Sequence, residues 1–333
     1  MNKKKKLTAQ EAASVLYANG IEFISGKWYY KDTEILNIDS YLLATGLFSS
    51  VSYKDEAKSY FIQLYGTTGD WKPLPIIAEA KAQKELKPLC YPLSHKQLVI
   101  INYLLRHDEE IFFILTGVGG SGKSTFANII CQIFDNDTAS LNLSDLSEDF
   151  KLATGVGHRL IYSDELNSDD INGGQLKQLF SNQTITVNPK FEKPFQTRFQ
   201  SAFFFNCNIA PRLDLCDSGM MRRILYFEMN EKIQNPDPSM NKKTWTRADL
   251  VNIVAHALQQ DMTNWKDLFM KETRYYLVKD NSVFRHKEHT DYASYAEACK
   301  REGLRPFSAP KWENIRALLK EWGFIESYGE EVF

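Results

Sequence analysis

The stretch Gly117-Val-Gly-Gly-Ser-Gly-Lys-Ser-Thr125 decides the fold of this chain. It fits the phosphate-binding pattern G-x-x-x-x-G-K-[ST], which starts at Gly117 and ends at Lys123-Ser124. Residues 111–115 before it form an apolar run of the length of a buried strand, and residues 124–134 after it carry apolar side chains on one helical face. Strand, glycine-rich loop and helix are the context that the pattern requires. The chain is therefore expected to hold a polyphosphate at this loop.

The chemistry expected of the loop follows from its backbone. The N–H groups of a glycine-rich loop and the positive end of the following helix both attract phosphate oxygens. Lys123 is expected to reach the β- and γ-phosphates, and the Ser124 hydroxyl is expected to ligate Mg²⁺. We therefore expect ATP and Mg²⁺ as ligands. The residues expected to contact the nucleotide are Gly117, Gly119, Gly120, Ser121, Gly122, Lys123, Ser124 and Thr125.

The composition is that of an ordinary globular protein, since 43% of the 333 residues are hydrophobic and 25% are charged. The formal net charge of -2 excludes a global basic field, so any surface for nucleic acid must be local. The five cysteines are scattered without C-x-x-C spacing, and no cysteine or carboxylate cluster of metal-site form accompanies His286 and His289. We find neither a signal peptide nor a membrane-spanning run, so a reduced, cytoplasmic location without membrane contact is expected.

Local patterns divide the chain into four expected parts. The first opens with a helix over residues 8–18, where Thr8 and Glu11 form a capping box, and continues as a hairpin over residues 22–30. The last segment, residues 272–333, alternates short helices with expected strands. The four parts are a small α+β module (1–75), a helical linker or collar (76–108), the nucleotide-binding core (109–265) and a C-terminal domain (266–333).

An acidic pair follows a second apolar strand. Residues 159–163 are followed by Asp164-Glu165. Ligands of open α/β sheets bind at this end of the strands. Hydrolysis of a phosphoanhydride needs carboxylates in two roles. We expect Asp164 to hold Mg²⁺ and Glu165 to orient and polarise the attacking water.

Two further polar positions border apolar strands. The run 203–205 ends in Asn206-Cys-Asn208, and an asparagine there can contact the γ-phosphate or the attacking water; Asn208 is favoured, with Asn206 as the alternative. Arg222 and Arg223 directly precede another apolar strand. An arginine in such a place can stabilise developing phosphate charge, often from a neighbouring subunit, and Arg223 is favoured for this role.

A lysine-rich hairpin is expected between the acidic pair and the asparagines. Residues 185–187 and 200–204 read as strands, with the hairpin at residues 188–195 between them. Lys190, Phe191 and Lys193 place cations beside an aromatic ring, a combination that suits phosphate contact and base stacking on single-stranded nucleic acid. The alternative is an ordinary exposed hairpin.

The order of these parts resembles that of the superfamily 3 helicases, compact AAA+ proteins of viral, phage and plasmid replication. The resemblance to the poxvirus-type and phage primase-helicase branch rests on 208–211, 217–219 and 222–225, and more weakly on 291–295 and 303–308. It implies an AAA+ P-loop core with a parallel central sheet and a winged-helix-like C-terminal domain. It also implies that the asparagine is sensor 1, that Arg223 is an arginine finger beside Arg222, and that Lys190-Phe191 grips DNA in a channel.

The function implied by this resemblance is an ATP-dependent DNA helicase. Subunits are expected to form a ring, with a hexamer as the expected size, and to translocate on single-stranded DNA. The C-terminal domain, including a helix over residues 312–324, is expected to contact duplex DNA, or else to use its aromatic residues for its own core. Residues 8–75 show no acidic constellation of the primase type. Two alternatives stay open: an initiator that melts DNA without processive unwinding, and a small-molecule kinase.

Overall fold

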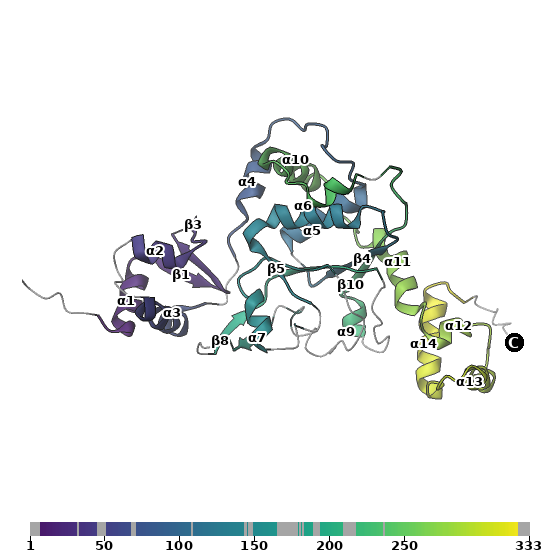
Figure 1. The fold of residues 1–333 in the computed structure, drawn as a ribbon. Helices are drawn as coiled ribbons and strands as arrows, with labels where there is room; N and C mark the ends of the chain where they lie inside the picture. Colours follow the sequence, from purple (N-terminus) through teal and green to yellow (C-terminus); the bar gives the residue numbers. More distant parts are fainter. Residues whose placement is uncertain are drawn as a thin grey trace, which may run out of the picture.

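The computed structural model describes most of the chain as three bodies in a row (Figure 1). A small N-terminal module lies at one end, an α/β core lies in the middle, and a group of short helices lies at the other end. The described residues are 7–31, 33–44, 51–67, 71–107, 109–142, 145, 149–164, 179, 181, 183–188, 194–208, 218–235 and 237–325.

The centre of the core is a five-stranded sheet in which every neighbouring pair is parallel. Its order is β10-β4-β9-β6-β5. A parallel strand buried on both faces must be apolar throughout, which explains the uninterrupted run Ala202–Phe205 in β9. The predicted α/β fold with a parallel central sheet is confirmed. The strands are β4 (Phe112–Gly117), β5 (Thr138–Ser140), β6 (Leu160–Ser163), β9 (Ala202–Asn206) and β10 (Ile224–Met229).

Alternate side chains of each strand enter two separate cores. Phe113 and Leu115 of β4 pack under the helices drawn above the sheet in Figure 1, whereas Phe112 and Ile114 face the opposite side. Capping boxes fix the starts of two covering helices, at Ser94 before α5 and at Thr246 before α10. The helices of this upper layer are α4 (Pro75–Ala82), α5 (His95–Arg106), α6 (Lys123–Phe134) and α10 (Arg247–Leu258).

Short helical segments complete the core. They are η1 (Asp135–Asp137), α7 (Asp149–Leu152), η3 (Ala153–Gly155), α9 (Ser218–Met221) and η4 (Pro238–Lys242). Within the described residues, no helix combines the length and hydrophobicity needed to cross a bilayer.

The N-terminal module combines helices with a small antiparallel sheet. The Thr8–Glu11 capping box is present, and the hairpin turns at Ser25-Gly26. Helix α3 was not evident in the sequence. Its buried face includes Ala57 and Phe61, and charged and polar residues interrupt the apolar pattern around them. The elements are α1 (Ala9–Ala18), β1 (Ile21–Ile24), β2 (Lys27–Tyr30), β3 (Thr33–Glu34), α2 (Ile38–Ala44) and α3 (Val51–Tyr65).

The N-terminal module is docked onto the amino ends of the central strands. Lys27 is 4% exposed and pairs with Glu34 at 2.6 Å and with Asp137, which precedes β5. Arg159, which precedes β6, bonds the same Asp137 at 3.2 Å. The turn at Gly26 approaches the core so closely that a Cβ there would lie 2.5 Å from the backbone nitrogen of Gly157. A buried ionic contact and a tight backbone contact thus join the two bodies.

Two paired strands flank the segment expected to carry the lysines, whose residues 189–193 lie outside the described residues, and the second strand is different from the one predicted. Strand β7 (Thr184–Val187) pairs antiparallel with β8 (Phe195–Arg198), whereas the strand predicted at residues 200–204 corresponds to the start of β9 in the central sheet. Alternation of polar and apolar residues marks β8 as a half-exposed strand, whereas β9 is fully buried and belongs to the central sheet. The Phe195 ring packs in the N-terminal module, 6.1 Å from the Phe23 ring.

Residues 266–325 form four helices joined by turns and contain no strand, so the strands expected after residue 272 are wrong within that range. Residues 304–308 have no regular secondary structure. The core of this part includes Tyr295, Trp312 and Leu319. The winged-helix character of the domain stays a prediction. The helices are α11 (Asp267–Val278), α12 (Ser282–Arg285), α13 (Tyr292–Arg301) and α14 (Ala309–Glu321).

Candidate nucleotide-binding site

The phosphate loop joins the carboxyl end of β4 to the start of α6, as the sequence predicted. Gly117 has φ +137°, and a Cβ on it would lie 2.1 Å from the carbonyl oxygen of Met229, so only glycine fits there. A Cβ on Gly120, at φ +80°, would meet nothing within 4 Å. One side of the loop therefore packs against β10, and the other opens toward space where phosphates can approach the backbone.

The loop lysine is folded back onto its own loop. Lys123 is 7% exposed, and its Nζ donates hydrogen bonds to the carbonyl oxygens of Gly117 at 2.7 Å and Val118 at 2.9 Å. Burial lowers the pKa of the Lys123 ammonium, and the nearby Cys207 opposes that shift. A phosphate is a stronger partner for an ammonium than two neutral carbonyls, so an anionic ligand at the loop would favour its charged form.

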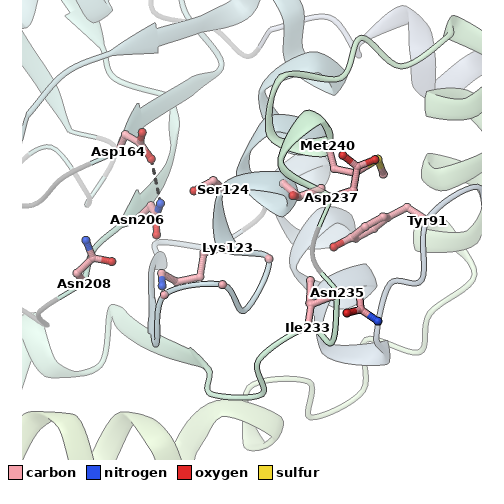
Figure 2. Close-up of a pocket in the computed structure, with 14 residues that line it drawn as sticks. Tyr91, Lys123, Ser124, Asp164, Asn206, Asn208, Ile233, Asn235, Asp237 and Met240 are labelled. Atoms are coloured by element: carbon pink, nitrogen blue, oxygen red, sulfur yellow. Dashed lines mark hydrogen bonds between the residues drawn. The ribbon is translucent and has the colours of Figure 1, made fainter.

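A cavity of about 520 Å³ opens beside the loop, within the range of small-molecule sites (Figure 2). One end holds Lys123, Ser124 and the polar ends of two central strands, and the other end holds a tyrosine and residues that follow β10. The cavity is lined by Tyr91, Gly119, Gly120, Gly122, Lys123, Ser124, Thr125, Asp164, Asn206, Asn208, Ile233, Asn235, Asp237 and Met240.

A short hydrogen-bond network holds Asp164 at the carboxyl end of β6. The Asn206 amide Nδ2 donates to Asp164 Oδ1 at 2.9 Å, and the Tyr162 hydroxyl donates to the same oxygen at 2.6 Å. Burial raises the pKa of Tyr162, and the neighbouring carboxylate raises it further, so this hydroxyl stays protonated and donates. The Asn206 Oδ1 is buried and accepts no hydrogen bond from any described residue. It is the kind of polar atom that a bound ligand or water can satisfy.

Several predicted site residues lie together in this cavity, while others fall outside the described residues. Gly119, Gly120, Gly122, Lys123, Ser124, Thr125, Asp164 and Asn208 line it. Gly117 shapes the loop from behind, and the Ser121 hydroxyl donates to the Val118 carbonyl oxygen at 2.9 Å inside it. Glu165, Lys190, Phe191 and Lys193 lie outside the described residues.

Both candidate asparagines line the cavity, and their surroundings differ. Asn206 is 5% exposed and bonds Asp164, whereas Asn208 is exposed. Figure 2 shows Asn206 between Asp164 and Lys123, with Asn208 beside them. The sequence favoured Asn208 but could not show that Asn206 contacts the acidic residue.

The arginines occupy the opposite edge of the sheet, and Arg223 does not have the exposure that its expected role needs. It is 5% exposed, its Nε donates to Glu110 Oε2 at 2.9 Å, and an Nη donates to the Gly219 carbonyl oxygen at 2.7 Å. The pairing of β10 with β4 brings Arg223 beside Glu110, which the sequence alone did not reveal. Arg222 next to it is exposed, so it is the better placed of the two to reach another subunit.

The far end of the cavity is formed by residues that the sequence did not single out. The segment after β10 is attached to the loop, because the Ile233 N–H donates to the Gly120 carbonyl oxygen at 3.0 Å. Burial raises the pKa of Tyr91, whose hydroxyl also bonds Thr125. Asp237 caps η4 by accepting from the Ser239 N–H at 2.9 Å.

The five-stranded parallel sheet, with a glycine-rich phosphate loop at the end of a central strand, defines a P-loop NTPase-like core. Comparison with known proteins adds two findings from sequence. A family of unknown function (DUF5906) matches residues 115–223, about a third of the chain. The chain is also 26% identical over 174 residues to "Putative helicase L207/L206" of Acanthamoeba polyphaga mimivirus. That match covers 49% of this chain and only 18% of the mimivirus protein.

Solved structures show the same fold over nearly the whole chain. The A form apo structure of the NrS-1 C-terminal region matches with a TM-score of 0.50 and 15% identity, covering 93% of this chain and 86% of that one. The apo structure of the NrS-1 C-terminal region (305-718) also matches with a TM-score of 0.50 and 15% identity, covering 96% and 87% of the two chains. The likeness supports the architecture.

Proposed function

We propose that this chain is an ATP-dependent helicase of the superfamily 3 type, which hydrolyses ATP and moves along single-stranded DNA. The observation that carries the proposal is the meeting of Lys123, Ser124, Asp164 and Asn206 around one cavity at the carboxyl edge of a parallel sheet. The name of the mimivirus relative supports the helicase part of the proposal. A role in replication follows from the resemblance described above.

In this proposal, the chain's own residues perform four tasks. Lys123 leaves its loop carbonyls and pairs with the phosphates. Ser124 and Asp164 supply oxygen ligands for Mg²⁺, the donor type that this ion prefers, and both line the same cavity. The ion, when bound, neutralises charge on the phosphates. Asn206 holds Asp164 in place, Asn208 contacts the γ-phosphate or water, and Glu165 orients the water.

The far end of the cavity supports a preference for adenine. Tyr91, Ile233 and Met240 offer apolar surface for a base, and Asp237 offers a carboxylate beside them. A carboxylate accepts a hydrogen bond from the exocyclic amino group of adenine, whereas the O6 of guanine is itself an acceptor at the corresponding position. We propose that position 6 of the base faces Asp237, rather than the N1–H and 2-amino edge by which guanine can also donate to a carboxylate; in this orientation ATP is favoured over GTP.

We propose that a residue of the neighbouring subunit completes the site, and that the subunits form a ring of six. Arg222 is exposed at the amino edge of the sheet, so in a ring it can face the γ-phosphate bound by the neighbouring subunit. Arg223 supports it from behind through its ion pair with the exposed Glu110. Lys190, Phe191 and Lys193, which lie between β7 and β8 in the sequence, contact the DNA strand in this proposal. The electrostatic share of that contact falls with added salt.

The test is ATP hydrolysis with and without a single-stranded oligonucleotide, followed by strand displacement on a forked duplex. Lys123→Ala should lower turnover by at least about 100-fold, the scale for losing one donor to developing charge. Lys320→Ala on the exposed face of α14 is the matched control and should leave turnover unchanged. DNA-stimulated hydrolysis with strand displacement supports a helicase, and melting without displacement supports the initiator. A monomer whose hydrolysis ignores DNA supports the kinase.

A further inference from the structure

A group of metal-ligating side chains lies in the loop between α12 and α13, in the C-terminal part shown at one end of Figure 1. His286, Glu288 and His289 each offer a ligand atom, and these atoms all lie within 4.8 Å of one another. Glu288 Oε1 lies 3.9 Å from His286 Nδ1 and 3.4 Å from His289 Nε2. The carboxylate thus lies between the two rings. A small movement of these side chains would bring the distances between their ligand atoms to those found around a bound ion.

A second carboxylate lies behind the buried histidine. His286 is 7% exposed, and its Nε2 is buried and makes no hydrogen bond that satisfies the geometry with any described residue. Glu302 Oε2, from the end of α13, lies 3.2 Å from this Nε2. The separation is short enough that a small turn of the ring or of Glu302 would complete a hydrogen bond, which would hold the ring proton on Nε2 and leave the lone pair of Nδ1 facing Glu288. Such a carboxylate-histidine pair commonly supports a metal ligand from outside.

The loop that carries these side chains is held by three helices. His286 ends α12, and its N–H donates to the Ser282 carbonyl oxygen at 3.0 Å. Arg316 of α14 donates from one Nη to the carbonyl oxygen of Lys287 at 3.1 Å and to that of His289. The His286 ring packs 6.3 Å from the Tyr295 ring of α13. The ligand atoms therefore lie on a fixed loop, which reduces the entropy cost of gathering them around an ion.

We propose that His286, Glu288 and His289 bind a divalent transition-metal ion, Zn²⁺ by the chemistry of the donors, with Glu302 orienting His286. Two imidazoles and one carboxylate suit Zn²⁺, whereas Mg²⁺ and Ca²⁺ prefer oxygen alone. Together, Glu288 and Glu302 offset the two positive charges of the ion. Bound there, Zn²⁺ fixes the loop between α12 and α13. The site uses no residue of the phosphate loop and does not depend on the proposed function.

The test is Zn²⁺ titration of the full chain, free of any affinity tag and stripped with a chelator, followed by calorimetry at pH 7.5. We expect about one Zn²⁺ ion to bind per chain, and we expect this binding to depend on these side chains. His289→Ala and Glu288→Gln change partly exposed residues and should weaken binding by at least about 100-fold. Glu302→Gln should weaken it by about 10- to 100-fold. His256→Ala, which changes a histidine on α10 far from this loop, should bind as the wild type does.

A second readout follows the fold rather than the affinity. Zn²⁺ should raise the midpoint of thermal unfolding of the wild-type chain, because an ion that binds only the folded state stabilises it. This rise should be lost in His289→Ala, whose unfolding without metal should match that of the stripped wild type. The proposal is overturned if the wild type takes up no stoichiometric Zn²⁺. It is equally overturned if His289→Ala and Glu288→Gln bind as tightly as the wild type.

Discussion

The side-chain amide of Asn206 donates a 2.9 Å hydrogen bond to the carboxylate of Asp164, across the ends of the neighbouring strands β9 and β6. Parallel pairing places Ser163 opposite Phe205, so the residues that follow them, Asp164 and Asn206, lie side by side. The contact ties the acid expected to hold the metal to an amide whose Oδ1 is buried and unsatisfied among the described residues. Asn206 can therefore report on both the acid and a ligand.

Replacing Asn206 by alanine should slow ATP hydrolysis. Asp164 would keep only the hydrogen bond from Tyr162, and its carboxylate could rotate away from the cavity. We expect kcat to fall by about 10- to 100-fold at saturating ATP with a small change in KM, because positioning rather than binding is lost. Steady-state kinetics of this variant beside Asn208→Ala will assign the two asparagines. Wild-type kcat in Asn206→Ala would remove it from the mechanism.

Changing Asp237 to asparagine should reduce the preference for ATP over GTP. Asparagine can still cap η4, as Asp237 does through the Ser239 N–H, so the local fold is kept while the charge is removed. The ratio of kcat/KM for the two nucleotides should fall by about tenfold, the effect of one hydrogen bond to a charged group. Ser239→Ala serves as the control. An unchanged ratio would show that the base does not lie against Asp237.

Lys27 should be needed for docking of the N-terminal module. Its removal leaves Glu34 and Asp137 partly buried with one cation fewer, although Arg159 still bonds Asp137. Breaking a buried pair in this way costs about 3 kcal/mol. Limited proteolysis of Lys27→Ala should therefore cut the module from the core at lower protease concentration than in the wild type. Lys31→Ala, at an exposed turn, is the control, and equal resistance of both variants would contradict the docking role.

Cys131 and Cys207 should react more slowly than Cys90 with a thiol-alkylating reagent. Burial raises the pKa of Cys131 to about 12 and that of Cys207 to about 11. A raised thiol pKa keeps the thiolate scarce at pH 8, so both should resist iodoacetamide there and react faster as the pH approaches these values. Cys90 is exposed and should be labelled first among these three, despite a pKa raised by partial burial. Equal labelling of Cys131 and Cys90 at pH 8, measured by mass spectrometry, would contradict the burial.

The parallel sheet and the phosphate loop could be predicted from the sequence because local signals determine them. The G-x-x-x-x-G-K-S pattern and the uninterrupted apolar runs are properties of consecutive residues. The buried state of Arg223 depends instead on Glu110, which strand pairing brings to it from more than a hundred positions away. The roles of Tyr91 and Asp237 likewise depend on where two distant loops meet, and no local pattern marks that place.

The histidine cluster shows the same limit. Glu288 stands between His286 and His289 in the sequence, yet nothing local indicated that His286 is buried or that Glu302 lies beside its Nε2. Strand β8 was missed because its alternating pattern is short, and a longer apolar run follows immediately. Predictions from local patterns therefore held for the core, and those that depend on distant contacts needed the folded chain.

The most direct test of a site completed by a neighbouring copy is hydrolysis by mixed subunits. Lys123→Ala and Arg222→Ala should each be inactive alone, the first without the phosphate lysine and the second without the arginine. Mixed in equal amounts and allowed to exchange, they should recover roughly a quarter of wild-type hydrolysis, because a quarter of the interfaces combine an intact loop with an intact arginine. Recovery at that level is the predicted result. A mixture no more active than its parts, or full activity of Arg222→Ala alone, would contradict the account.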